Sequence, residues 1–269
     1  MGKPFTRLDL KMIAICSMFL DHGMKLFAQP MKMLLQNMTN SVILTEWIFL
    51  FLSGFGRVAF LVFGFQIAEG IRYTHDMQAY WKRLGLFALL SEIPYQMMVS
   101  WIQTGDVVVR FAFQNVFVTL FFGALACGLF GQMMQQGRPK TAKYIVCVCV
   151  ITVFLLHTDY GSLGVLYIFL CYIFQKTFYE KKGRLCGMLL IYGLSLPVQY
   201  LTLVFSGHMA LGAAVAYIVV YLANGFLALA IINRYHGEKG KNVNPYLFYG
   251  FYPVHILALV GLRMVLESI

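Results

Sequence analysis

An aspartate and a histidine lie next to each other inside an otherwise apolar stretch near the start of the chain. Residues 8–28 read LDLKMIAICSMFLDHGMKLFA, with Asp21 and His22 well inside the run and Lys11 near its beginning. Ionisable side chains at membrane depth are costly, so their usual role is functional. Histidine is the side chain best suited to moving protons near neutral pH. His22 is therefore the first candidate for chemistry.

The spacing of Lys11 and His22 predicts that the two side chains share one face of a helix. They are eleven positions apart, which is close to three helical turns and about 16 Å of helix. A cation at the membrane surface and a base deeper on the same face would suit an anionic donor whose reactive end reaches inward. The structural alternatives are a Lys11 side chain that extends to the lipid headgroups and a His22 that serves helix packing.

Other polar residues in apolar stretches extend the candidate site. Glu92 lies mid-span beside Pro94, whose missing N–H loosens the helix, and it is a candidate proton partner. Asn115 begins another apolar stretch and either caps a helix or donates an N–H to a developing oxyanion. His255 lies in the last apolar stretch at a depth similar to that of His22.

A buried arginine requires a carboxylate partner. Arg57 follows two glycines near the outer third of the membrane, and Asp21, Asp159 or Glu46 could serve as its partner. Neighbouring residues on a helix point about 100° apart, so we expect Asp21 to orient a basic group such as Arg57 rather than His22. A structural ion pair explains Arg57 as well as a substrate contact does.

Three further residues are candidates for contact with the substrate. Asp159 lies at a predicted outer turn, where it caps the next helix, contacts a substrate amine, or does both. Tyr160 follows it directly, and Glu69 lies near the cytoplasmic end of the second predicted span.

The composition requires a membrane environment for these groups. The chain has 269 residues, of which 60% are hydrophobic and 12% charged, and its mean hydropathy is +0.72. Such a chain is an all-α, polytopic bundle in contact with membrane lipids, and one domain over residues 1–269 suffices. The net charge of +10 comes from short loops, so a nucleic-acid partner is not expected.

The hydropathy pattern predicts about nine transmembrane helices. Residues 29–51 are expected to form an interfacial loop or short helix. Lys and Arg concentrate in segments 3–11, 72–83, 138–143, 176–184 and 234–241, which places the N-terminus in the cytoplasm. The predicted spans are 8–28, 52–73, 80–101, 113–134, 143–157, 160–178, 184–203, 210–232 and 246–266.

Several motifs of soluble enzymes are absent from the sequence. It contains no Walker A motif, GxGxxG, CxxC or HExxH, so NTP hydrolysis, dinucleotide binding and zinc chemistry have no support, and no metal is predicted.

Taken together, stretches along nearly the whole chain resemble the TraX family of polytopic membrane proteins, which is named for the acetylation of conjugative pilin. They are KMIAICSMFLDH (11–22), GRVAFLVFGFQIAEG (56–70), RLGLFALLSEIPYQ (83–96), QNVFVTLFFG (114–123), DYGSLGVL (159–166) and FYPVH (251–255).

This resemblance extends to the wider group of transmembrane acyltransferases, and it implies a donor, a location and a role for His22. In that group a basic residue, usually Arg, precedes a first-span His by ten intervening positions, and Lys11 holds that place here. The resemblance implies that acetyl-CoA is the donor from the cytoplasmic side, that His22 is essential, and that the protein lies in a bacterial cytoplasmic membrane. Basic residues at the cytoplasmic mouth would hold the CoA phosphates: Lys11, Arg72, Lys82 and Arg83.

The leading hypothesis is an acetyltransferase that acts on an amine or hydroxyl, such as a pilin N-terminus, another peptide or a glycan. His22 would be the general base or a transient acyl carrier. Asp21, Glu92 or His255 would adjust its protonation, while Asn115 and Arg57 would stabilise charge in the transition state. A proton-coupled transporter is the alternative, and a membrane scaffold is a third. The oligomeric state and the identity of the acceptor stay open.

Overall fold

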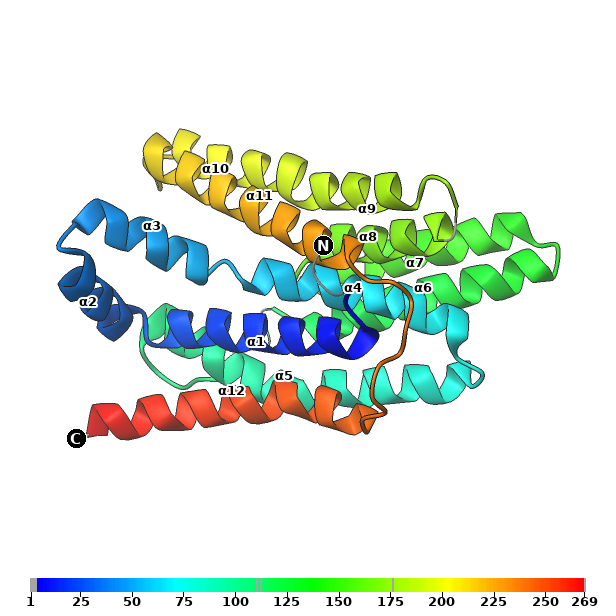
Figure 1. The fold of residues 1–269 in the computed structure, drawn as a ribbon, viewed down its shortest axis with the longest axis horizontal. Helices are drawn as coiled ribbons and strands as arrows, with labels where there is room; N and C mark the ends of the chain where they lie inside the picture. Colours follow the sequence, from blue (N-terminus) through cyan, green and yellow to red (C-terminus); the bar gives the residue numbers. More distant parts are fainter. Residues whose placement is uncertain (1–3, 110, 112, 176, 269) are drawn as a thin grey trace. The chain divides into compact units, whose positions relative to one another are not determined.

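The computed structural model describes every residue except 1–3, 110, 112, 176 and 269. Within the described residues the regular elements are all helical: twelve α-helices and one π-helical segment (Figure 1). Three basic residues that contribute to the predicted charge asymmetry, Lys3, Arg110 and Lys176, lie outside the described residues.

The helices coincide with the predicted spans, with one addition and one subdivision. Residues 29–51 form mainly two helices, and predicted span 184–203 consists of α9, the π-helical segment and α10. The helices are α1 (Arg7–Leu26), α2 (Ala28–Thr39), α3 (Val42–Leu52), α4 (Gly56–Tyr73), α5 (Met77–Thr104), α6 (Val116–Gln135), α7 (Pro139–Leu155), α8 (Gly161–Phe174), α9 (Glu180–Met188), the π-helix (Leu189–Ser195), α10 (Leu196–Phe205), α11 (Leu211–Asn233) and α12 (Pro245–Ser268).

Local sequence explains where the helices begin and end. Thr6 and Asp9 form a capping box at the start of α1, in which the Thr6 hydroxyl accepts a bond from the Asp9 backbone N–H and the Asp9 carboxylate accepts one from the Thr6 N–H. Asp76 caps α5 through a 2.8 Å bond from the Ala79 N–H. Gly105 ends α5 at φ 77°, a left-handed conformation that glycine adopts without steric cost.

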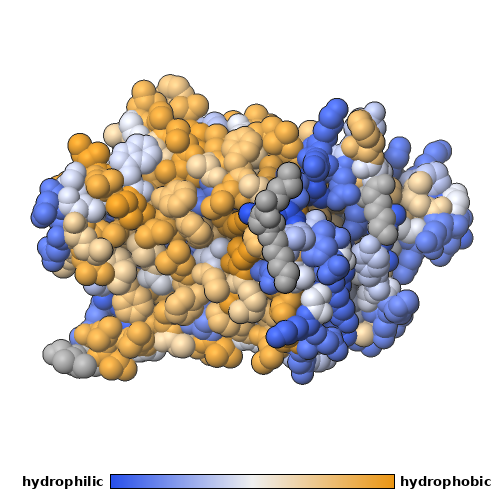
Figure 2. All heavy atoms as spheres, in the orientation of Figure 1, coloured by the Kyte–Doolittle hydropathy of each residue, from blue (hydrophilic) through white to orange (hydrophobic). Residues whose placement is uncertain are grey.

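Length and hydropathy identify this chain as a multi-pass membrane protein. Among the described residues, five helical stretches are long and apolar enough to cross a bilayer: Val42–Tyr73, Val116–Gln135, Glu180–Phe205, Leu211–Asn233 and Pro245–Glu267. Hydrophobic residues cover the surface around α10 and α11 in Figure 2, where Val198, Phe205 and Val219 are exposed. In a membrane, lipid tails cover such side chains.

Backbone contacts divide the chain into two compact units, and the prediction of a single domain over 1–269 stays a prediction. Unit 1 consists of Met1–Val62, Tyr192–Asn244 and His255–Ile269. Inside unit 1, α2 and α3 form a hairpin in which Lys32 Nζ lies 2.8 Å from both carboxylate oxygens of Glu46. Helix α11 packs against α3 and α10, and α1 contacts α2 and α3.

Unit 2 consists of Phe63–Ile191 and Pro245–Val254. Inside it α6 packs against α5, α7 and α8, and α8 packs against α9. The Trp81 indole N–H of α5 donates a 3.2 Å bond to the Ala124 carbonyl of α6. A buried apolar cluster joins α6, α7 and α8, and it contains Ala126, Val146, Cys149, Val153 and Val165.

Candidate functional site

Two buried histidines of unit 1, from the first and last helices, are in hydrogen-bond contact. His22 Nδ1 of α1 lies 2.8 Å from His255 Nε2 of α12, and the ring planes are 2° from parallel. His22 is 9% and His255 4% exposed. One of the two facing nitrogens carries a hydrogen and the other accepts it, because two protonated nitrogens would repel at this distance. The pair is therefore placed to hold and pass on a proton.

Helical periodicity directs both histidines inward. On α1, the residues Leu10, Ala14, Met18 and His22 are buried at a spacing of about one turn. On α12, His255 is followed one turn later by the buried Leu259. The sequence predicts that the two histidines lie at similar depth, and the structure brings their side chains together.

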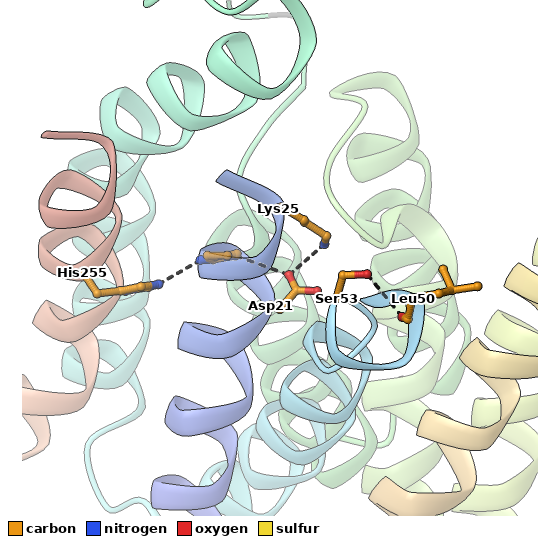
Figure 3. A network of polar contacts seen from close by, with 6 residues as sticks. Asp21, Lys25, Leu50, Ser53 and His255 are labelled. Atoms are coloured by element: carbon orange, nitrogen blue, oxygen red, sulfur yellow. Dashed lines mark hydrogen bonds and ion pairs between the residues drawn. The ribbon is translucent and has the colours of Figure 1, made fainter. Parts of the chain in front are cut away.

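Asp21 lies beside this pair and is held by a lysine. Its carboxylate accepts a 2.7 Å bond from Lys25 Nζ, one turn further along α1, and lies 3.9 Å from His22 Nε2 (Figure 3). The expectation that Asp21 points away from its neighbour His22 is therefore wrong. The distance is too long for a hydrogen bond but short enough for attraction to a protonated imidazole.

Gly56 makes room for the Asp21 carboxylate. A Cβ at position 56 would lie 2.7 Å from the Asp21 carboxyl carbon, closer than real side chains approach. The carboxylate is thus fixed between the lysine on its own helix and the start of α4. Successive polar contacts within unit 1 therefore link Lys25 to Asp21, Asp21 to His22, and His22 to His255.

Arg57 is held by an aromatic ring in unit 1. Its guanidinium carbon lies 4.5 Å from the ring centre of Tyr221 on α11, a cation–π contact. Glu46, one of the three carboxylates suggested as its partner, binds Lys32. Tyr221 itself packs edge-on against Tyr217 at 5.7 Å between ring centres.

Glu92 and Asn115 form a separate polar cluster, in unit 2. The Glu92 carboxylate accepts a 3.2 Å bond from the Asn115 backbone N–H and bonds from the side-chain amides of Asn115 and Gln96. The Asn115 amide also donates a 2.8 Å bond to the Ala88 carbonyl, while its oxygen caps α6 by accepting from the Phe117 N–H at 2.9 Å. These contacts favour the capping role for Asn115, because both kinds of group on its side chain are engaged.

The remaining substrate-contact candidates also lie in unit 2. Tyr160, at φ 63°, and not Asp159, is the N-cap residue of α8, and no side chain caps this helix. The backbone around Asp159 is tied to α6, since its N–H donates a 2.9 Å bond to the Gln114 carbonyl and its carbonyl accepts from the Thr119 hydroxyl. Glu69 is buried in α4.

The four basic residues proposed for the donor occupy different surroundings. Lys11 is half-buried on α1. Arg72 lines a cavity of about 1140 Å³ in unit 2, whereas Lys82 and Arg83 are not part of its lining. The Arg83 guanidinium lies 6.0 Å from the Tyr80 ring centre. Over the part of the chain that the structure describes, no three His, Cys, Asp or Glu side chains are grouped to hold a metal ion.

Four residues near these sites escaped the sequence reasoning. The spacing of Asp21 and Lys25, one helical turn, could have revealed that pair. Tyr221 beside Arg57, and Lys143 and Gln175 in the cavity lining, carry no local signal because their partners are distant in sequence.

The fold defines a multi-pass helical membrane protein with a buried line of ionisable side chains in unit 1. The family model described as TraX protein matches residues 6–263, and the chain belongs to this family. The chain is also similar to a "Probable fimbrial assembly protein FimC, serogroup H1" of Dichelobacter nodosus. The two are 25% identical over 268 residues, which cover 98% of each chain. No solved structure matches the chain.

Proposed function

We propose that this protein is an integral membrane acetyltransferase that moves an acetyl group from acetyl-CoA to an amine or hydroxyl. The observation that carries the proposal is the buried contact between His22 and His255, with Asp21 next to it. General bases of this kind contribute about 10²–10⁴-fold to the rate of proton-coupled reactions.

In the proposed reaction, the acceptor's nitrogen or oxygen attacks the carbonyl carbon of the acetyl thioester while His22 takes its proton. The carbon–sulfur bond then breaks and CoA leaves as a thiolate. The imidazolium returns the proton to this thiolate, so that His22 ends the cycle neutral. The Asp21 carboxylate, 3.9 Å from His22 Nε2, favours the charged imidazolium that forms in between.

The geometry assigns each nitrogen a role in this scheme. If His22 Nδ1 carries the hydrogen and donates it to His255 Nε2, the lone pair of His22 lies on Nε2, the nitrogen closer to Asp21. His255 then acts as a positioning residue that selects the reactive tautomer of His22. Arg57 remains a candidate for stabilising charge, whereas the amide of Asn115 is engaged by Ala88 and Glu92.

Topology and relatives suggest where the substrates come from. The proposal places the N-terminus and the basic loops in the cytoplasm of a bacterium, with about nine spans in the cytoplasmic membrane. Acetyl-CoA would then enter from the side of Lys11, Arg72, Lys82 and Arg83. The relative named as a fimbrial assembly protein favours a pilus peptide over a glycan as the acceptor.

The second candidate is a proton-coupled transporter. The line from Lys25 through Asp21 and His22 to His255 is a series of ionisable groups inside a membrane protein, and such series also serve as proton relays. A transporter would drive substrate flux with a proton gradient and would have no need of acetyl-CoA.

The test measures acetyl-CoA binding and turnover by the purified chain in detergent, with His22→Ala beside the unchanged protein. We expect binding to persist in His22→Ala and turnover to fall by about 10²–10⁴-fold. His208→Ala is the matched control, since His208 lies in an exposed turn where it contacts Ser206. If neither protein binds or turns over acetyl-CoA, while proteoliposomes show proton-driven flux, the transporter replaces the enzyme.

A further inference from the structure

Unit 2 contains a large cavity, and one of its lining residues, Arg72, is among the residues proposed above to hold the CoA phosphates. For a nucleotide ligand the inference below therefore rests on the proposed function. The cavity volume of about 1140 Å³ is slightly above the range of about 300–1,000 Å³ that small-molecule sites usually occupy. The wall is formed by the last turn of α4, the second half of α6, the first half of α7 and the end of α8. Phe130 and Phe169 of this wall pack edge to face, with ring centres 4.9 Å apart.

Two cations from different helices line this cavity. Arg72 ends α4 and Lys143 lies in the first turns of α7, and both side chains are exposed. Arg72 Nη1 donates a 3.0 Å bond to the backbone carbonyl of Gln175, which ties the end of α4 to the end of α8. The guanidinium has five N–H donors, so this single recorded bond leaves donors for an anion in the cavity.

The buried side-chain amide of Gln175 adds a hydrogen-bond acceptor to the two cationic donors. Gln175 is only 7% exposed and lines the cavity, and its side-chain oxygen Oε1 accepts no hydrogen bond from any residue that the structure describes. A buried acceptor without a partner costs free energy, and native structures seldom retain one without a reason. A ligand with an N–H or O–H group would satisfy it.

We propose that this cavity binds a phosphate-bearing ligand that carries a hydroxyl or amine near the phosphate. Arg72 and Lys143 contact the phosphate, as charged donors do in most phosphate sites. Gln175 Oε1 accepts a hydrogen bond from the hydroxyl or amine, and the apolar wall covers the organic part. Two sources share this chemistry: a soluble nucleotide, and the headgroup of an anionic phospholipid.

The experiment measures binding to the purified full chain in detergent with one probe for each source. The probes are adenosine 3′,5′-bisphosphate and dihexanoyl phosphatidylglycerol, and dihexanoyl phosphatidylcholine is the control lipid, because its headgroup has no N–H or O–H and no net charge. Lys143→Met and Gln175→Leu each remove one cavity contact. Lys140→Met removes an exposed cation of α7 that does not line the cavity.

We expect one of the two phosphate probes to bind saturably, with phosphatidylcholine inactive. Its affinity should fall about tenfold in Lys143→Met and in Gln175→Leu, the loss of one charged or polar contact, and stay unchanged in Lys140→Met. Binding of the nucleotide assigns the cavity to a soluble ligand, and binding of phosphatidylglycerol assigns it to a lipid. The proposal is overturned if neither probe binds, or if the cavity variants bind as the unchanged protein does.

Failure of the phosphate-site proposal can be distinguished from failure of the acetyltransferase proposal. Acetyl transfer that persists in Lys143→Met, without binding of either probe, would remove the phosphate site and leave the role of His22 intact. Conversely, a phosphate probe that binds to a chain without any acetyl-CoA turnover would establish the cavity alone.

Discussion

The buried polar cluster around His22 in unit 1 and the one around Glu92 in unit 2 differ in how their hydrogen bonds are used. In unit 1, His22 and His255 share one short contact, and Asp21 lies 3.9 Å from the second nitrogen of His22. In unit 2, the Glu92 carboxylate is surrounded by N–H donors of Asn115 and Gln96, which do not titrate. In the first cluster the hydrogen between the two imidazoles can lie on either ring, whereas in the second the Glu92 carboxylate accepts from amide N–H groups whose donor role is fixed.

The difference teaches how a buried polar group can be recognised as reactive or structural. A carboxylate whose oxygens accept hydrogen bonds from amide N–H groups stabilises the helix ends that supply those groups. Removing one partner leaves a buried polar group without its hydrogen bond, which costs stability. In a pair of imidazoles the shared hydrogen can lie on either ring. The surrounding groups therefore decide which nitrogen carries the hydrogen and which nitrogen is left to act as a base. We therefore expect mutations of the His22–His255 pair mainly to change activity, and mutations of the Glu92–Asn115 cluster mainly to change stability.

Among variants that keep His22, the largest effect should come from His255→Leu, which removes the hydrogen-bond partner of His22. We expect turnover to fall by about 10²-fold, since His22 loses the contact that selects its tautomer. His255→Gln offers an amide oxygen to the same His22 N–H and should recover most of this loss. Equal loss of turnover in both variants would instead mean that His255 itself carries the proton. Steady-state rates of both variants with acetyl-CoA, measured at several pH values, decide between a positioning role and a proton-carrying role for His255.

Asn115→Ala should mainly affect stability. It removes the cap of α6 and the amide donor to Glu92 and Ala88, at a cost of about 3 kcal/mol in the free energy of unfolding. Titration with a denaturing detergent measures this change, and the rate per folded molecule should stay near that of the unchanged protein. A normal unfolding curve with a lost rate would place Asn115 in the transition state after all.

Gly56→Ala should have the smallest effect, because it disturbs the reactive cluster only through packing. Its Cβ would displace the Asp21 carboxylate, and overpacking of this kind costs about 1–3 kcal/mol in stability. Turnover should fall modestly as Asp21 moves. Gly23→Ala, also near the cluster, has nothing within 4 Å of the added Cβ and should be neutral or slightly stabilising. Equal behaviour of the two variants would contradict the close fit of Asp21 against α4.

Much of the helical structure could be predicted from the sequence, while the roles assigned to the site residues stay predictions. Each helix is held by bonds between residues four apart and marked by local apolar runs, so predicted spans such as 210–232 agree with α11 (Leu211–Asn233). Residues 29–51, expected from the sequence to be one interfacial loop or short helix, instead form most of α2 and of α3, and the apolar α3 belongs to the stretch Val42–Tyr73 that is long and apolar enough to cross a bilayer. The nine-span topology and the acetyl-CoA dependence stay predictions.

By itself, the sequence determined the membrane class, the helices, the family and the presence of ionisable groups at His22 and His255, because composition and short-range periodicity carry that information. Only the tertiary structure decided which of these groups meet. The contact of His22 with His255, of Arg57 with Tyr221, and of Arg72 with Gln175 all join residues more than a hundred positions apart. Such contacts depend on how whole helices pack, and a local pattern does not encode them.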